Sequence, residues 1–166
     1  FVGNKDGNIF HFKNTGSVTN PTFVEQTGTS NPFNGVDVGV QGAPTFVDVD
    51  NDGDKDTFVG NKDGKILHFK NTGSATNPIF VAQTGTDNPF NGVDVGGFAK
   101  PTFVDVDNDG DKDAFVGDSE GNILHFKNTG SATNPIFVEQ TGTDNPFNGV
   151  DVGRYATPTF VDVDKD

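Results

Sequence analysis

Aspartates at every second position form the most distinctive chemical pattern in this sequence. The run DVDNDGDKD begins at Asp48, returns at Asp105 and begins again at Asp162. Thirteen of the 24 acidic residues lie in these three runs. Two unit charges about 4 Å apart repel each other by about 1 kcal/mol even in water, and by more near a protein surface. Crowding of this kind predicts that each run binds a cation.

Each complete run follows the pattern D-x-D-x-D-G-x-x-D. The glycine at the sixth position, Gly53 in the first run, allows a sharp turn, and the seventh residue can offer its backbone carbonyl. Carboxylate and carbonyl oxygens suit Ca²⁺, whereas zinc prefers histidine or cysteine, and magnesium prefers a tighter octahedron with retained waters. We therefore expect Ca²⁺ as the cofactor. The candidate metal ligands are Asp48, Asp50, Asp52, Asp54, Asp56, Asp105, Asp107, Asp109, Asp111, Asp113, Asp162, Asp164 and Asp166.

Two other interpretations of the acidic runs fit the sequence less well. An EF-hand needs a glutamate at the twelfth loop position and flanking helices, but that position is Val59 and both flanks have the pattern of strands. A solvated acidic turn would not require regular spacing, a glycine at the sixth position and recurrence along the chain.

The chain consists of three copies of one unit. FVGNKDGNIFHFKNTGS at Phe1 recurs with small changes at Phe58 and Phe115, which gives a period of 57 residues and the copies 1–57, 58–114 and 115–166. Repeats at a fixed period predict structural modules that bury their faces against their neighbours.

Each unit contains four segments with the pattern of short strands. In the first complete unit we expect strands at Pro44–Asp50, Thr57–Gly60, Lys65–Asn71 and Ile79–Thr84, with a hairpin turn at 61–64. No segment has helical periodicity, and glycine and proline recur too often for a long helix.

Four antiparallel strands per repeat predict an all-β chain of β-propeller blades, in which the calcium loop joins the first strand of a blade to the second. Residues 1–166 then form one repeat array, with blades at about 44–84 and 101–141 and partial blades at 1–27 and 158–166. A β-solenoid would use shorter coils, and a sandwich would not need near-identical units.

The segment GAPTFVDVDNDGDKDTFVG resembles the FG-GAP repeat, also called the VCBS-type repeat, of integrin α-subunit propellers and many bacterial surface proteins. The resemblance rests on the 48–56 loop, on Phe58-Val59-Gly60 after it and on Gly42-Ala43-Pro44 before it. The second copy has Ala99-Lys100-Pro101 in place of Gly-Ala-Pro. The stretches NPFNGVDVG and HFKNTGSATNP are similar to repeats of large secreted cyanobacterial proteins. The resemblance implies a calcium-bound propeller, usually extracellular, that serves in adhesion or as a scaffold.

The net charge of the chain and the number of blades determine which partners and which location we expect. With 24 acidic and 11 basic residues the net charge is −13, which disfavours nucleic acid and anionic membranes as partners, and no apolar run is long enough to insert into a membrane. Weak calcium sites would fill only outside the cell, so we expect an extracellular or cell-surface protein. Three blades leave open edges, so we expect self-association head-to-tail or membership of a longer array.

Carbohydrate binding is the main alternative function, and catalysis is not expected. His11, His68 and His125 share one repeat position, and no nucleophile or carboxylate stands at a spacing typical of a catalytic triad. A multivalent lectin-like propeller would use the long loops, although NPFNG also fits an ordered turn with a buried phenylalanine. Segments 40–43, 97–100 and 154–157 vary between copies and could carry specificity for a glycan or surface protein. The candidate ligand residues are Asn88, Phe90, Asn91, Arg154 and Tyr155, and Asn31, Phe33, Asn34, Asn145, Phe147 and Asn148 are the loop equivalents.

Overall fold

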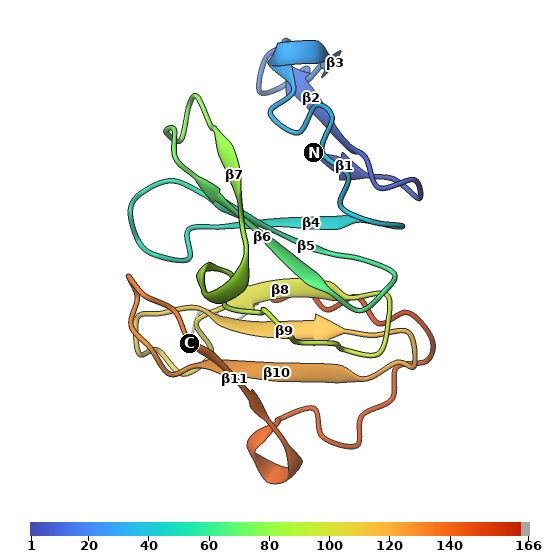
Figure 1. The fold of residues 1–166 in the computed structure, drawn as a ribbon, viewed down its shortest axis with the longest axis vertical. Helices are drawn as coiled ribbons and strands as arrows, with labels where there is room; N and C mark the ends of the chain where they lie inside the picture. The colour runs from blue at the N-terminus through green and yellow to red at the C-terminus, as the bar shows by residue number, and fades with distance from the viewer. Residues whose placement is uncertain (164–166) are drawn as a thin grey trace.

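The computed structural model describes residues 1–163, which fold into three antiparallel β-sheets that follow one another along the chain (Figure 1). The first sheet contains β1 (Val2–Gly3), β2 (Ile9–Asn14) and β3 (Phe23–Gln26). The second contains β4 (Ala43–Val47), β5 (Asp56–Gly60), β6 (Ile66–Asn71) and β7 (Phe80–Gln83). The third contains β8 (Lys100–Val104), β9 (Asp113–Gly117), β10 (Ile123–Asn128) and β11 (Phe137–Gln140). Strands adjacent in sequence pair with one another, which confirms the expected all-β chain of antiparallel units.

The first strand of each complete sheet is shorter than the sequence pattern indicated. β4 ends at Val47, which pairs with Asp56, so the aspartates from Asp48 onward belong to the loop and not to the strand. Alternation of apolar and polar residues continues into the acidic run and cannot mark this boundary. The hairpin between β5 and β6 forms as expected, because the Asn61 side chain accepts hydrogen bonds from the backbone N–H groups of Asp63 and Lys65.

Three short 3₁₀ helices lie in the long polar loops, where the sequence predicted no regular structure. They are η1 (Gly28–Ser30), η2 (Gly85–Asp87) and η3 (Gly142–Asp144). Each precedes an NPFNG segment that leads toward the next repeat.

Phenylalanines from adjacent repeats pack together between the sheets. Phe90 follows η2, and its ring stacks on Phe137 of the third sheet with the centroids 4.6 Å apart. The same ring lies edge-on to Phe58 of its own repeat at 5.7 Å and to Phe126 at 5.6 Å. Phe33 makes the equivalent contacts between the first and second sheets. The loop after the last strand of one sheet therefore supplies the core between that sheet and the next.

The first strands of neighbouring sheets also approach one another closely. The Thr45 hydroxyl on β4 donates a hydrogen bond of 2.8 Å to the carbonyl of Pro101 on β8. A Cβ atom at Gly60 would lie 2.2 Å from the carbonyl oxygen of Ala99, so the glycine of the FVG segment leaves room for the next repeat. A Cβ atom at Gly117 would likewise lie 2.2 Å from the carbonyl oxygen of Ala156.

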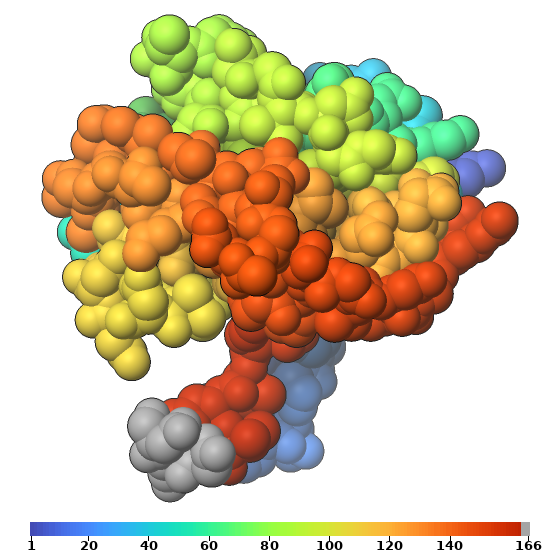
Figure 2. All heavy atoms as spheres, turned by 90° about the horizontal axis from the view of Figure 1, so that it is seen from below, coloured from blue at the N-terminus to red at the C-terminus, as the bar shows by residue number. Residues whose placement is uncertain are grey.

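A further unit begins near residue 158 but does not form a strand in the described residues. The segment 158–163 matches β4 and β8 in sequence, yet it does not join a sheet, unlike the strand expected there. Phe160 nevertheless packs 4.7 Å from Phe115, as Phe103 packs 4.7 Å from Phe58. Figure 2 views the array from the side of the third sheet, where residues of the last repeat, orange to red, form much of the visible surface.

No helix in the described residues 1–163 is long and apolar enough to cross a membrane.

Candidate metal centre

The acidic loops lie at one end of the sheets, between the first and second strands of each complete unit. In Figure 1 the loops after β4 and after β8 both lie on the left. The β5–β6 and β9–β10 hairpins lie at the opposite end of the strands. The acidic run therefore joins the first and second strands of each four-stranded sheet, as the sequence pattern predicted.

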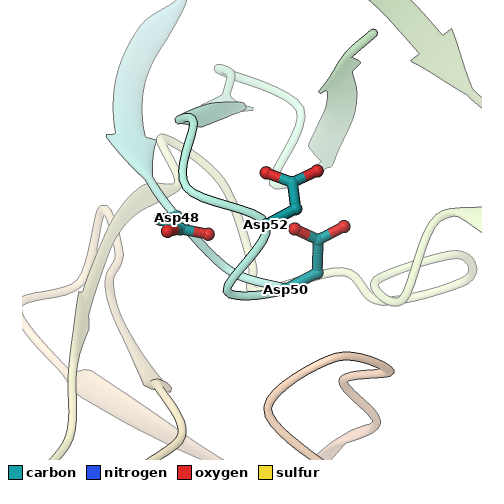
Figure 3. Close-up of side chains that lie close together, drawn as sticks. All are labelled: Asp48, Asp50 and Asp52. Atoms are coloured by element: carbon teal, nitrogen blue, oxygen red, sulfur yellow. The ribbon is translucent and has the colours of Figure 1, made fainter. Parts of the chain in front are cut away.

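Three aspartates of each loop bring their carboxylates together. One oxygen from each of Asp48, Asp50 and Asp52 lies within 4.8 Å of the others, and Figure 3 shows the Asp50 and Asp52 carboxylates side by side. Asp105, Asp107 and Asp109 form the same cluster in the next loop. The first, third and fifth positions of the repeat pattern therefore converge in both loops.

Backbone hydrogen bonds hold this loop in its turned conformation. The Gly53 N–H donates to Asp48 Oδ2 at 3.2 Å, and the Asp54 N–H donates to Asp52 Oδ1 at 3.1 Å. Gly53 has a φ of 96°, in the left-handed region that favours glycine, which explains the glycine at the sixth position.

Several carboxylate oxygens in the loops are buried without a hydrogen-bond donor. They are Asp48 Oδ1, Asp50 Oδ1, Asp54 Oδ1, Asp105 Oδ1 and Asp111 Oδ1. Desolvation, followed by repulsion from the neighbouring aspartates, raises the pKa of the Asp54 and Asp111 carboxyls. Oxygen atoms that lack donors and repel one another are suited to a hard divalent cation, so the residues present fit Ca²⁺.

The ninth loop position has a second role in the fold. Asp56 is buried at the start of β5, and its Oδ1 accepts a hydrogen bond of 2.7 Å from the Asn71 N–H. Its Oδ2 has no donor and lies 3.8 Å from His68 Nε2. Asp113 likewise accepts a hydrogen bond from the Asn128 N–H and has an Oδ2 without a donor, and burial raises its pKa. One oxygen of this aspartate thus anchors the third strand, while the other is free to bind a cation.

Lysines of the third strand approach the clusters, a contact that sequence reasoning missed. Lys70 Nζ forms an ion pair with Asp50 and lies 3.9 Å from Asp52, and Lys127 contacts Asp107 in the same way. The hydrogen bond from Lys127 lowers the pKa of Asp107, and that from Lys70 to Asp50 raises the pKa of the lysine. One sequence signal could have predicted this contact. The lysine of the HFKN segment lies 14 residues after Asp56 and again 14 residues after Asp113.

The third acidic run lies mostly beyond the described residues. Asp162 is in the extended segment 158–163, and Asp164 and Asp166 fall outside the residues that the structure describes.

The candidate ligand residues of the NPFNG loop divide into structural and exposed groups. Asn88 donates to the carbonyl of Ile66 at 3.0 Å and accepts from the Phe90 N–H, and Asn31 and Asn145 make the equivalent contacts. Phe90 is 1 % exposed, so its ring cannot stack on a ligand, contrary to its candidate role, and Phe33 is buried in the same way. Phe147 is half-buried, whereas Asn34, Asn91 and Asn148 are exposed.

Arg154 and Tyr155 are exposed and precede the segment equivalent to β4 and β8, so they belong to the end of the array opposite the acidic loops.

The repeated histidine is part of the packing of the sheets. His68 and His125 are buried and stack on Phe58 and Phe115 with ring centroids 4.4 Å apart in each pair.

The comparison with protein families identifies the repeat. The model described as an FG-GAP-like repeat matches residues 48–116, from the first acidic loop into β9. Residues 48–116 are therefore similar to an FG-GAP-like repeat, and together with the antiparallel sheets this similarity suggests a repeat module of β-propeller type. No curated protein matches the chain significantly. No solved structure matches it significantly either.

Proposed function

We propose that this chain is a calcium-stabilised extracellular module of β-propeller type that serves as a structural and adhesion scaffold. The observation that carries the proposal is the pair of aspartate clusters, each with buried oxygens that have no hydrogen-bond donor. Ca²⁺ bound there would neutralise the repulsion and tie the first strand of the sheet to the second.

The expected affinity supports a location outside the cell. Extracellular calcium modules bind with dissociation constants of about 10⁻⁴ to 10⁻³ M. At a free calcium concentration 100 times the dissociation constant, one site would stabilise the folded chain by about 2.7 kcal/mol, compared with a typical total of about 5–15 kcal/mol. Such sites would be empty at cytosolic calcium concentrations.

Calcium titration with thermal unfolding tests the proposal. The chelator-treated chain should bind about two Ca²⁺ ions at the described clusters, and its melting temperature should rise with calcium. Asp50→Asn combined with Asp107→Asn should abolish most of this rise, whereas Asp63→Asn, an exposed acid outside the loops, should preserve it. Equal melting temperatures in calcium and in chelator would contradict the proposal.

The open faces of the array support assembly with a second copy. Phe12 on β2 is 38 % exposed, although its repeat equivalents Phe69 and Phe126 are 4 % and 2 % exposed. Those two are covered by the rings of Phe33 and Phe90 from the preceding repeat. Phe147 occupies the same repeat position as Phe33 and Phe90, one repeat further along the chain. We propose that Phe147 of one copy packs against Phe12 and Phe23 of the next, so that copies associate head-to-tail.

A second candidate function, multivalent glycan binding, is favoured by a groove that recurs between the sheets. A groove of about 630 Å³ between the second and third sheets is lined by Asn88, Asn91 and His68, and a groove of about 540 Å³ lies between the first and second sheets. Amide and histidine side chains can exchange hydrogen bonds with sugar hydroxyls. A glycan array tests this candidate: saturable binding that Asn91→Ala reduces would support it, and an array without binding would favour the scaffold.

A further inference from the structure

Three bulky residues at one repeat position adopt a strained backbone conformation. Gln41, Phe98 and Tyr155 have φ angles of 59°, 53° and 63°. Outside glycine, the other positive φ angles in the described chain belong to Asn51 and Asn108, and asparagine tolerates this region better than bulky residues do. Glycine would adopt the same conformation without strain, so the fold alone does not account for these side chains.

The strained conformation is fixed by backbone contacts that do not depend on the side chains. The N–H of Gln41 donates to the carbonyl of Lys5, and the N–H of Phe98 donates to the carbonyl of Lys62. The N–H of Tyr155 likewise faces the carbonyl of Ser119 at 3.4 Å. Each turn is therefore held against the hairpin of the preceding sheet, whichever residue occupies it.

These turns meet at a groove of about 560 Å³ to which all three repeats contribute. The residues with side chains that can contact a ligand are Asn4, Lys5, Gln41, Phe98, Lys100 and Tyr155. Tyr155 is 53 % exposed, and its ring lies edge-on to Phe98 with the centroids 4.8 Å apart. Because β4 and β8 run from these turns toward the acidic loops, the groove and the metal clusters lie at opposite ends of the strands (Figure 1).

The charge of this groove is opposite to that of the chain. No carboxylate lines it, although the chain has 24 acidic residues. In the described residues, neither the Lys5 nor the Lys100 ammonium group lies within 4 Å of a carboxylate. In the described residues, two lysines that form no ion pair and two aromatic rings thus line the same groove.

We propose that this groove binds a carboxylated sugar unit of an acidic glycan. The apolar face of the sugar ring packs against Tyr155 and Phe98, as aromatic side chains do in ligand pockets with few polar groups. The carboxylate pairs with Lys100 and Lys5 through charge-assisted hydrogen bonds. The chemistry of the groove requires an anion and a ring in the same ligand, which a neutral glycan or a simple carboxylate does not supply.

Calorimetry of the calcium-loaded chain with two matched tetrasaccharides, one of glucuronic acid and one of glucose, tests the proposal. We expect one saturable site for the acidic tetrasaccharide, at least tenfold weaker binding of the neutral one, and weaker binding at higher salt. Lys5→Gln should reduce the affinity severalfold. Lys62→Gln, at the equivalent position one repeat later but outside the groove, should not. Equal affinity for both sugars, binding to neither, or equal effects of the two lysine variants would overturn the proposal.

A glycine variant separates a ligand role from a structural role. Phe98→Gly combined with Tyr155→Gly removes both rings and relieves the left-handed strain. If the rings bind ligand, glycan affinity should fall at least tenfold while the melting temperature changes little. A large fall in melting temperature with unchanged glycan affinity would show that the rings serve the fold, and the proposal would be withdrawn. Calcium binding, measured on the same variants, reports separately on the metal clusters.

Discussion

The Asp56 carboxylate accepts a hydrogen bond of 2.7 Å from the backbone N–H of Asn71, 15 residues further along the chain. Asp113 and Asn128 repeat this contact at 2.8 Å. The last aspartate of each acidic loop therefore also fixes the end of the third strand of its sheet. Both aspartates are almost fully buried, so the hydrogen bond is protected from water.

Two substitutions at Asp56 should separate its structural role from its proposed metal role. Asp56→Ala leaves the Asn71 N–H buried without an acceptor, and should lower the free energy of unfolding by about 1–3 kcal/mol in chelator. Asp56→Asn keeps an acceptor oxygen but removes the charge, so it should lose less stability in chelator and still weaken calcium binding. Urea unfolding in calcium and in chelator measures both effects. Equal stability of the two variants in chelator would contradict the structural role.

The Lys70 ammonium group should compete with the metal ion for the carboxylates of the loop, because it contacts Asp50 and lies near Asp52. Exposed ion pairs contribute about 0–1 kcal/mol, so Lys70→Met should raise the calcium affinity by up to about fivefold. The same variant should be slightly less stable in chelator, since the carboxylates then lose their cation. Calcium titration of Lys70→Met beside Lys62→Met, a lysine outside the cluster, provides the measurement and its control.

Phe90 should contribute more to stability than its repeat equivalent Phe147. Phe90 packs against rings of two sheets, whereas the described contacts of Phe147 are with Phe115 and Phe160. Phe90→Ala should cost about 3–5 kcal/mol, as truncation of a buried phenylalanine usually does, and Phe147→Ala should cost clearly less. Urea unfolding at low protein concentration compares them. Equal losses would argue against Phe90 as the core between adjacent sheets.

The sequence predicted the parts of this molecule that depend on local patterns. Period-2 alternation located the strands to within a few residues, and the spacing of Asp48, Asp50 and Asp52 located the cluster, because both signals are set by neighbouring residues. The end of β4 was missed because Val49 continues the alternation of apolar and polar residues beyond the last paired residue, Val47.

Contacts between repeats could not be predicted in the same way. The left-handed turns at Phe98 and Tyr155 are imposed by carbonyls of the preceding hairpins, which lie more than 30 residues away in the sequence. The ion pair of Lys70 likewise depends on how β6 lies beside the acidic loop. Periodicity assigns a residue to a strand but does not identify its neighbours on the next sheet.

Head-to-tail association should depend on the exposed phenylalanines of the first sheet. Phe12→Ser combined with Phe23→Ser should abolish concentration-dependent association in calcium, because these rings form the proposed docking surface. Val18→Ser, at a fully exposed position in the β2–β3 connection, should leave association unchanged. Sedimentation velocity over a range of protein concentrations measures the effect. A stable monomer of the unmodified chain at all concentrations would contradict the proposed assembly.

The pH dependence of stability should reverse when calcium is removed. In chelator, the raised pKa values of Asp54, Asp111 and Asp113 mean that the folded chain takes up protons before the unfolded chain does. Stability should therefore rise as the pH falls from 7 toward the ordinary value of 3.8, and this contribution is lost again as the pH rises through the folded pKa values. The lowered pKa values of Asp94 and Asp107 act in the opposite sense. They stabilise the fold above pH 3.8, and this contribution is lost as the pH falls through their folded pKa values.

In chelator, the contribution of the three acids with raised pKa should therefore increase as the pH falls from 7 toward 4. In saturating calcium, protons compete with the bound ion, so stability should fall over the same range from pH 7 to 4. Thermal unfolding at half-unit pH intervals, with calcium and with chelator, measures both curves. The Asp113→Asn variant should show a weaker rise in chelator, because Asp113 is the most buried of the three acids with raised pKa. Parallel curves with and without calcium would mean that the loops do not bind the ion, since only competition between protons and a cation at these carboxylates reverses the slope.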